Sequence, residues 1–276
     1  MEIWEAAVLG LVEGITEFLP VSSTGHLTIT EKLLGLPLDD PAVTGFTAVI
    51  QVGAIAAVVV YFAKDIGRMI TGFFGGLFSA QRRAGFEFRF ALYVGLGSLP
   101  ICVVGLLAQD LITGRLRSLW YVAGALILWS GVMVFAERAA TQQRGERQLR
   151  LADVLIIGFA QCLALVPGVS RSGATISVGL LRDLDRVTAT RLSFFLGIPA
   201  LVAAGVFQLK EATTGTAVGI PALAVGTLVS FVVAYASIAW LLRFVAHHSL
   251  VTFVWYRVTL GLFIIVALAS GVLSPV

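Results

Sequence analysis

Charged residues are scarce in this sequence. Only 13% of its 276 residues are Asp, Glu, Lys or Arg, whereas a typical soluble domain carries roughly 25%. Hydrophobic residues make up 58% of the chain. This composition excludes a soluble globular domain of the ordinary kind, so we expect most of the chain to have lipid as its solvent.

Cysteine pairs, basic tracts and nucleotide-binding motifs are also missing. The two cysteines, Cys102 and Cys162, lie in apolar segments and indicate neither a disulfide framework nor a zinc site. No basic tract points to nucleic acid, and no P-loop pattern is present. The N-terminus opens with Glu2 and Glu5, so it does not look like a cleavable signal, which needs a basic region.

Apolar runs about as long as a bilayer is thick recur along the chain. The first covers 19 residues, and a helix of that length at about 1.5 Å per residue reaches about 28 Å, close to the hydrocarbon core. We therefore expect an all-α polytopic membrane protein with six transmembrane helices. The predicted spans are Thr44–Phe62, Phe90–Ala108, Leu119–Ala136, Leu192–Leu209, Ile220–Leu242 and Val251–Gly271.

The basic residues predict a topology, because Lys and Arg concentrate in cytoplasmic loops. The six spans alternate between basic-rich and basic-poor connections if two weaker segments, Ile3–Leu34 and Leu151–Leu181, do not cross the membrane. Pro, Gly and Ser break both segments in the middle, so we expect two re-entrant helical hairpins. The first would enter from outside and the second from the cytoplasm, with both termini outside. The basic-rich connections are Lys64–Arg89, Glu137–Arg150, Arg182–Arg191 and Arg243–His248, and the basic-poor ones are Glu31–Asp40, Gln109–Arg117 and Lys210–Ala217.

The two broken segments match each other at an offset of 148 residues. In that register Ser22 falls on Ser170, and Phe46 falls on Phe194. Each half then holds one hairpin and three spans, and because three is odd the second half must be inverted relative to the first. We predict a single integral membrane domain (1–276) with inverted-topology repeats at approximately 1–136 and 151–276.

Two carboxylates interrupt the first hairpin. Glu13 and Glu17 are four residues apart, so a helix places both on one face. An ionised carboxylate at membrane depth costs several kcal/mol unless it faces water, a metal or a partner. The pair therefore predicts a site, and the alternative is a helix that lies in the interface with both carboxylates in water.

Three hydroxyls, Ser22, Ser23 and Thr24, follow the carboxylates, and His26 comes just after them. Ser and Thr before an apolar helix are commonly N-cap residues. Three hydroxyls with a histidine are more than a cap requires, and a hydroxyl near an imidazole is the minimal pair for nucleophilic or general-base chemistry. We therefore favour a chemical role for this turn.

The second hairpin supplies a positive charge, because Arg171 lies between Ser170 and Ser172 at a predicted helix start. Arginine binds phosphate with a planar fork of donors, and helix N-termini offer free N–H groups to anions. The alternative is an arginine that snorkels to the cytoplasm, which its place at the apex of the hairpin disfavours. Together the two hairpins predict an anionic-headgroup site within the membrane, suited to phosphoryl transfer on a lipid-borne phosphate.

The stretches EGITEFLPVSSTGH (Glu13–His26) and PGVSRSGAT (Pro167–Thr175) resemble the two signature motifs of the undecaprenyl-pyrophosphate phosphatase family, the bacterial bacitracin-resistance proteins. The resemblance covers essentially the whole chain. It implies hydrolysis of undecaprenyl pyrophosphate to undecaprenyl phosphate and inorganic phosphate, which recycles the lipid carrier for peptidoglycan synthesis and confers bacitracin resistance. It also implies a divalent cation, the bacterial cytoplasmic (inner) membrane with its lipid, and an active site that faces the extracytoplasmic side. A homodimer is left open.

The resemblance and the residues together give expected roles. Arg171 clamps the pyrophosphate, and Glu17, with Glu13, either binds Mg²⁺ or Ca²⁺ or tunes the acid/base group. Ser23 attacks the terminal phosphorus while His26 moves its proton, although a water nucleophile activated by Glu17 or His26 is equally compatible with the sequence. The expected substrate-binding residues are Ser22, Thr24, Ser170, Ser172 and Thr175.

Two other functions compete with the phosphatase. A secondary transporter or flippase of an anionic prenyl lipid is the main alternative, because inverted repeats with broken helices are typical of transporters. A binding or scaffold protein is the third, and the buried set of Glu, His and Arg argues against it. Phosphate release without a gradient would separate the enzyme from the transporter.

Overall fold

The computed structural model describes residues 1–37, 40–108, 116, 118–212 and 218–275, with the side chains of 206–212 left out. The described residues are mainly helical, and their one β-type contact is an isolated bridge between Arg144 and Leu184. The predicted connections Gln109–Arg117 and Lys210–Ala217 fall largely outside the described residues.

Among the described residues, six helices are long and apolar enough to cross a membrane, which confirms the predicted all-α polytopic class. Their ends differ from the predicted spans by a few residues, because the apolar runs continue into polar turns. For example, α11 begins at Arg186 rather than at Leu192. The six helices are α3 (Pro41–Tyr61), α6 (Phe86–Leu107), α8 (Leu119–Ala139), α11 (Arg186–Ala212), α12 (Ile220–His247) and α13 (Val251–Ala269).

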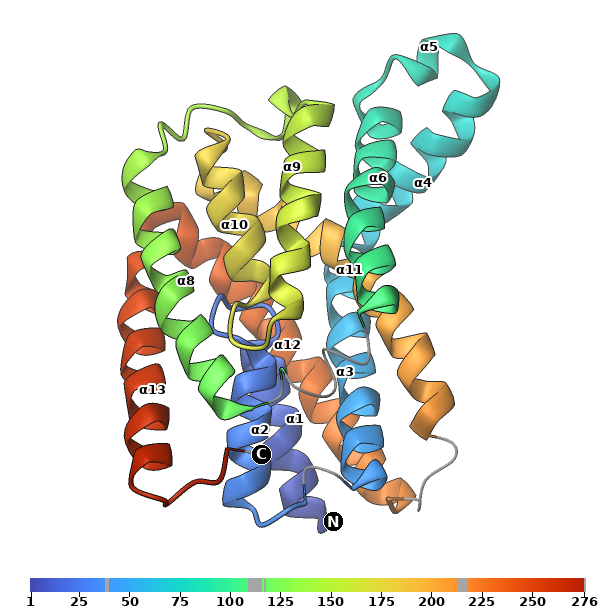
Figure 1. Ribbon diagram of the computed structural model, residues 1–276. Coiled ribbons are helices and arrows are strands. Elements are labelled where there is room, and N and C mark those ends of the chain that lie inside the picture. The colour runs from blue at the N-terminus through green and yellow to red at the C-terminus, as the bar shows by residue number, and fades with distance from the viewer. Residues whose placement is uncertain (38–39, 109–115, 117, 213–217, 276) are drawn as a thin grey trace.

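The two broken segments fold as helical hairpins. The first consists of α1 (Ile3–Thr16) and α2 (Ser23–Leu33). The second consists of α9 (Leu151–Gln161), the 3₁₀ turn η3 (Cys162–Leu165) and α10 (Arg171–Leu181). Figure 1 shows the first hairpin rising from the end of the bundle that holds both termini, the second descending from the opposite end, and their turns close together in the middle. Their re-entry into a bilayer stays a prediction.

The packing of α1 and α9 shows a reciprocal pattern. Helix α1 packs on α12, and α9 packs on α6, so each hairpin lies against a long helix of the other half. An ideal Cβ at Gly10 would lie 2.3 Å from the carbonyl oxygen of Gly226, and one at Gly158 would lie 2.3 Å from that of Gly97. These matched contacts favour the inverted repeat, which itself stays a prediction.

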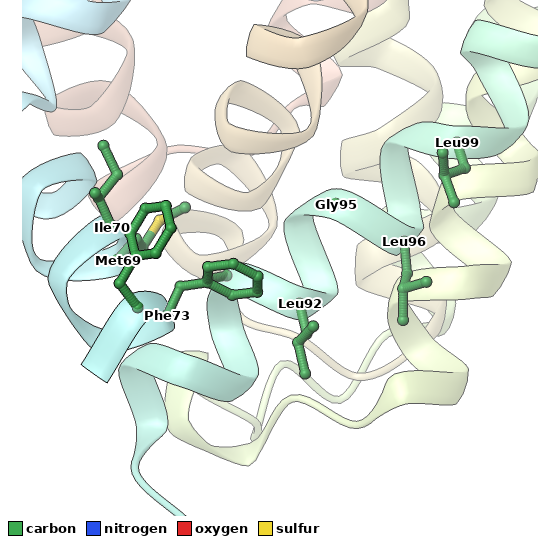
Figure 2. A pocket seen from close by; sticks show the side chains of 9 residues that line it. Met69, Ile70, Phe73, Leu92, Gly95, Leu96 and Leu99 are labelled. Carbon is green, nitrogen blue, oxygen red and sulfur yellow. The ribbon is translucent and has the colours of Figure 1, made fainter. Parts of the chain in front are cut away.

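The connection Lys64–Arg89 contains two helices, α4 (Ala63–Phe78) and α5 (Ala80–Arg83). They project beyond the rest of the bundle at the end opposite the termini (Figure 1). An apolar groove of about 460 Å³ lies between α4 and α6, and Figure 2 shows side chains that line it. Met69, Ile70, Phe73, Phe74, Ala91, Leu92, Gly95, Leu96 and Leu99 line it, so it lacks the charged groups of the candidate site.

Ion pairs gather at the same end of the molecule. The fully buried carboxylate of Asp153, at the start of α9, accepts hydrogen bonds from Arg144 and Arg182. Arg186 pairs with Glu137 of α8. Asp153 thus joins the start of α9 to the end of α10 and to the connection between α8 and α9, whereas Arg186 joins α11 to α8. The basic residues involved come from connections that were predicted to be cytoplasmic.

Candidate active site

The turns of the two hairpins are hydrogen-bonded to each other. The backbone N–H of Gly168 donates to Oγ of Ser22 over 3.1 Å, and Oγ of Ser172 donates to the carbonyl of Leu19 over 2.9 Å. Oγ of Ser170 also reaches the Leu19 carbonyl, at 3.5 Å. Residues about 150 positions apart in the chain are therefore joined near the centre of the bundle.

Helices α2 and α10 both begin where the two hairpin turns meet, a place that we call the junction. Each helix follows a serine in an unusual conformation. Ser22 precedes α2 and Ser170 precedes α10, and each has a φ of 75°. That region is sparsely populated by residues other than glycine, and such strain gathers at functional sites. Because the first N–H groups of a helix lack intrahelical partners, two helix N-termini at one place make a site for an anion.

Arg171, Glu17 and Ser23 form the polar centre of the junction. Nη2 of Arg171 lies 3.2 Å from Oε1 of Glu17, and the two side chains are only 10% and 6% exposed. Oγ of Ser23 donates to the other oxygen of Glu17 over 2.7 Å. One carboxylate thus joins a guanidinium from the second hairpin to a hydroxyl from its own hairpin.

Helix α11 holds the guanidinium of Arg171 in place. Nη1 donates to the carbonyl of Ser193 over 3.0 Å. An ideal Cβ at Gly197 would lie only 1.8 Å from Nη1, so the absence of a side chain there makes room for the guanidinium. Nε of Arg171 is buried and has no hydrogen-bond partner among the described residues, which leaves a donor for a ligand.

The carboxylates fit an oxygen-ligated divalent cation. Glu13 is 1% exposed, and its Oε1 has no hydrogen-bond partner within the part of the chain that the structure describes. It lies one turn before Glu17 on α1, so the same helix face presents both. Within the described residues, no group of three or more His, Cys, Asp or Glu side chains could hold a metal. The two carboxylates of Glu13 and Glu17 are consistent with Mg²⁺, which proteins often bind through one or two carboxylates plus substrate phosphates.

His26 does not face Ser23. Its Nδ1 lies 2.7 Å from the carbonyl oxygen of Ser22, and its Nε2 lies 2.6 Å from the hydroxyl of Tyr256 on α13. The hydroxyl of Ser23 is instead bonded to Glu17. In this conformation Glu17 is the group placed to take a proton from Ser23.

The remaining predicted residues have more local contacts. Oγ1 of Thr175 donates to the backbone carbonyl of Arg171 over 2.8 Å, within α10. Oγ of Ser172 also lies 3.1 Å from Oγ of Ser170. Thr24 is exposed in the first turn of α2. The structure therefore brings most predicted residues to one junction, with Thr175 one turn behind it.

Arg257 is a central residue that our sequence analysis missed. It is fully buried, and its guanidinium donates to carbonyls of both hairpin turns: Pro20 at 3.0 Å, Gly168 at 2.9 Å and Val169 at 3.1 Å. Its Nε donates to Oγ of Ser130 on α8 over 3.2 Å. A lone arginine within the apolar run Val251–Gly271 was the available signal, because charged residues inside membrane helices usually serve a function.

Comparisons with known proteins agree along nearly the whole chain. A family model described as bacitracin resistance protein BacA matches residues 6–263. The chain is 58% identical over 274 residues to undecaprenyl-diphosphatase 1 of Streptomyces coelicolor, covering 99% of this chain and 98% of that protein. It is 56% identical over 271 residues to the undecaprenyl-diphosphatase of Acidothermus cellulolyticus, covering 98% of each. The undecaprenyl-diphosphatase of Corynebacterium diphtheriae is 49% identical over 273 residues, with 98% of this chain and 95% of that protein covered.

Proposed function

The chain belongs to the bacitracin resistance protein BacA family, and on that premise we propose that it is an undecaprenyl-diphosphatase. It hydrolyses undecaprenyl pyrophosphate to undecaprenyl phosphate and inorganic phosphate, and so recycles the carrier lipid for peptidoglycan synthesis and confers bacitracin resistance. The observation that carries this proposal is the buried contact of Arg171 with Glu17, beside Ser23, at the meeting point of two helix N-termini.

Binding of the substrate follows from the charges at the junction. The guanidinium of Arg171 and the first N–H groups of α2 and α10 hold the pyrophosphate oxygens. The hydroxyl groups of Ser22, Thr24, Ser170 and Ser172 are the further substrate contacts that we assign to this position. These donors face the oxygens on which negative charge develops, which is how such sites lower the barrier to phosphoryl transfer.

Ser23 is placed to act as the nucleophile. Its Oγ attacks the terminal phosphorus, its proton passes to Glu17, and the bond from that phosphorus to the bridging oxygen breaks, so that undecaprenyl phosphate leaves. Water then cleaves the phosphoserine, which releases inorganic phosphate and restores the Ser23 hydroxyl. The competing route has water attack the terminal phosphorus directly, with Glu17 or His26 taking the proton.

Glu13 and Glu17 are the residues that would hold Mg²⁺ or Ca²⁺. When bound, such a cation neutralises charge on the pyrophosphate and polarises its phosphoryl oxygens. The unpartnered oxygen of buried Glu13 supports this assignment, because a buried carboxylate oxygen needs a partner.

We place the protein in the bacterial cytoplasmic membrane, as a multi-pass protein whose site opens toward the extracytoplasmic side. The six apolar helices support membrane integration. The basic connections at the end opposite the termini support an orientation with that end in the cytoplasm. Undecaprenyl pyrophosphate would then reach the junction laterally from membrane lipid, and a homodimer is not required for the site.

A transporter or flippase of an anionic prenyl lipid is not favoured, because the curated relatives are named as diphosphatases. Fold alone would not separate the two, since paired broken helices occur in transporters. Turnover in detergent does separate them, because detergent micelles support no gradient.

The deciding experiment is phosphate release from undecaprenyl pyrophosphate by detergent-purified protein, with Mg²⁺, with Ca²⁺ and with EDTA. We expect cation-dependent release that falls at least 100-fold in Arg171→Ala and in Glu17→Gln, since each removes a charged group of the site. Arg138→Ala, at an exposed position on α8, is the matched control and should retain wild-type activity. No release by folded wild-type protein with either cation would overturn the proposal.

The nucleophile is tested by quenching the reaction in acid and searching for phosphoserine by mass spectrometry. The serine route predicts a modified peptide that contains Ser23 and its absence in Ser23→Ala. Direct water attack predicts no modified peptide at any time during turnover.

A further inference from the structure

The side chain of Tyr256 contacts His26 of the candidate active site. Its hydroxyl lies 2.6 Å from Nε2 of His26, and the two rings stack with centroids 5.5 Å apart and planes 11° from parallel. Tyr256 comes from α13, far from the hairpins in sequence, and the residue is 50% exposed. Both the hydrogen bond and the stacking act on the same imidazole, so the ring position depends on Tyr256.

The two contacts of His26 determine which ring nitrogen carries hydrogen. The oxygen of the Ser22 carbonyl can only accept a hydrogen bond, so Nδ1, 2.7 Å away, must be the N–H donor. In a neutral imidazole, Nε2 then has the lone pair, and the hydroxyl of Tyr256 is the donor to it. The structure therefore assigns a neutral His26 to the tautomer protonated at Nδ1.

His26 in turn supports the residue that precedes the candidate nucleophile. Ser22 has a φ of 75°, and its carbonyl accepts from both Nδ1 and the backbone N–H of His26. Oγ of Ser22 also accepts a hydrogen bond from the backbone N–H of Gly168. The backbone of Ser22 sets the direction of Ser23, whose hydroxyl must stay on Glu17.

We propose that Tyr256 is a positioning residue: its hydroxyl holds His26 in the Nδ1-protonated tautomer, and His26 thereby holds the turn that aims Ser23. The expected effect on kcat rests on the proposed phosphatase function, whereas the expected tautomer of His26 does not. The next residue of α13, the buried Arg257, has a different role. That arginine holds the hairpin carbonyls from inside the bundle, whereas Tyr256 acts from the exposed side of His26.

Kinetics of Tyr256→Phe test the consequence for turnover, since this change removes the hydroxyl and keeps the ring. We expect kcat to fall by roughly tenfold, the effect of one lost hydrogen bond at its upper range. KM should change by less than about twofold, because the pyrophosphate contacts of Arg171 are untouched. The matched control is Tyr121→Phe, an exposed tyrosine on α8, which should retain wild-type kcat.

A double-mutant cycle tests whether Tyr256 acts through His26. In a His26→Ala background, Tyr256→Phe should have no further effect on kcat, because the group that Tyr256 positions is absent. An equal fall in kcat in both backgrounds would overturn the proposal. So would wild-type kinetics of the single Tyr256→Phe variant.

The tautomer can be measured without any turnover. The chain has three histidines, so ¹⁵N-histidine labelling with His247→Gln and His248→Gln leaves the signals of His26 alone. We expect a neutral imidazole protonated at Nδ1, and a shifted Nε2 resonance with a mixture of tautomers in Tyr256→Phe. Protonation at Nε2 in the otherwise unaltered protein would refute the assignment. If the protein released no phosphate, the proposed function would fail while this measurement still decided the role of Tyr256.

Discussion

At the scale of single residues, Gly197 is a position where one added methyl group should act directly on the candidate active site. Its missing Cβ leaves space for the guanidinium of Arg171, which would otherwise lie 1.8 Å from it. The backbone of α11 cannot retreat easily, because neighbouring Phe194 and Phe195 are fully buried in the core. The added methyl group must therefore displace Arg171.

We predict that Gly197→Ala lowers kcat/KM for undecaprenyl pyrophosphate by about 10- to 100-fold. The reason is that charge-assisted hydrogen bonds of Arg171, each worth about 1.5–3 kcal/mol, are lost. Phosphate release is the measurement, and thermal unfolding in detergent verifies folding. Gly131→Ala on α8, where an added Cβ meets nothing within 4 Å, is the control. Full activity of a folded Gly197→Ala variant would contradict the conclusion that the space at Gly197 holds the guanidinium of Arg171.

The sequence made some site residues predictable and hid others, for physical reasons. Glu17, Ser23 and Arg171 stand out because polar groups are costly in an apolar segment. Gly197 could not be found in this way, since glycine is common in the chain and its role appears only when Arg171 is placed against it. The pairing of His26 was predicted with Ser23, whereas the structure pairs it with Tyr256, because the partner comes from a helix that spacing alone does not bring near.

At the scale of secondary-structure elements, α13 joins the two hairpin turns through Arg257. One guanidinium supplies hydrogen bonds to the carbonyls of Pro20, Gly168 and Val169. These carbonyls lie in turns, where no helical N–H is available to them. Without the arginine they become buried acceptors that lack donors, each at a cost of about 1–3 kcal/mol.

We predict that Arg257→Leu lowers the apparent Tm in detergent by about 5–10 °C, as expected for a loss of a few kcal/mol in a protein of this size. It should also abolish activity, because the turns no longer meet in register. Arg243→Leu, at an exposed position of α12, is the matched control and should leave the Tm within about 2 °C. An unchanged Tm in Arg257→Leu would show that the turns hold together without α13.

The two hairpins pack on long helices through backbone contacts that tolerate only glycine. Gly10 of α1 lies against Gly226 of α12, and Gly158 of α9 lies against Gly97 of α6. Close approach of small residues is a common way to join helices in membranes. If the two halves are inverted repeats, the two contacts are the same structural element used twice.

We predict that Gly10→Ala and Gly158→Ala each destabilise the protein by about 1–3 kcal/mol, the usual cost of overpacking. Thermal unfolding in detergent measures the effect, with Gly124→Ala on α8 as a control in open space. Similar losses at both positions would support the repeat. A loss at one position only would show that the contacts are not equivalent.

At the scale of the whole molecule, the predicted spans agree with the six apolar helices because bilayer thickness fixes how long such a helix must be. The helices α4 and α5 were not predicted, since α4 is short and carries Lys64, Asp65 and Arg68 among its apolar residues. Hydropathy alone marks spans, and it does not distinguish a loop from a short amphipathic helix. The orientation in a bilayer likewise depends on charge rather than on the packing of the helices.

The last prediction concerns this orientation. If both hairpins re-enter, then the termini lie outside and the connection between α8 and α9 lies in the cytoplasm. In a variant whose two cysteines are replaced by alanine, a cysteine at Val272 should react with a membrane-impermeant maleimide on intact spheroplasts. A cysteine at Gln143 should react only after lysis; both positions are exposed. The reverse labelling pattern would show that the protein has the opposite orientation, with the candidate active site open toward the other side of the membrane. Labelling of both cysteines on intact cells would mean that one hairpin crosses the membrane, which is incompatible with two re-entrant hairpins around one central site.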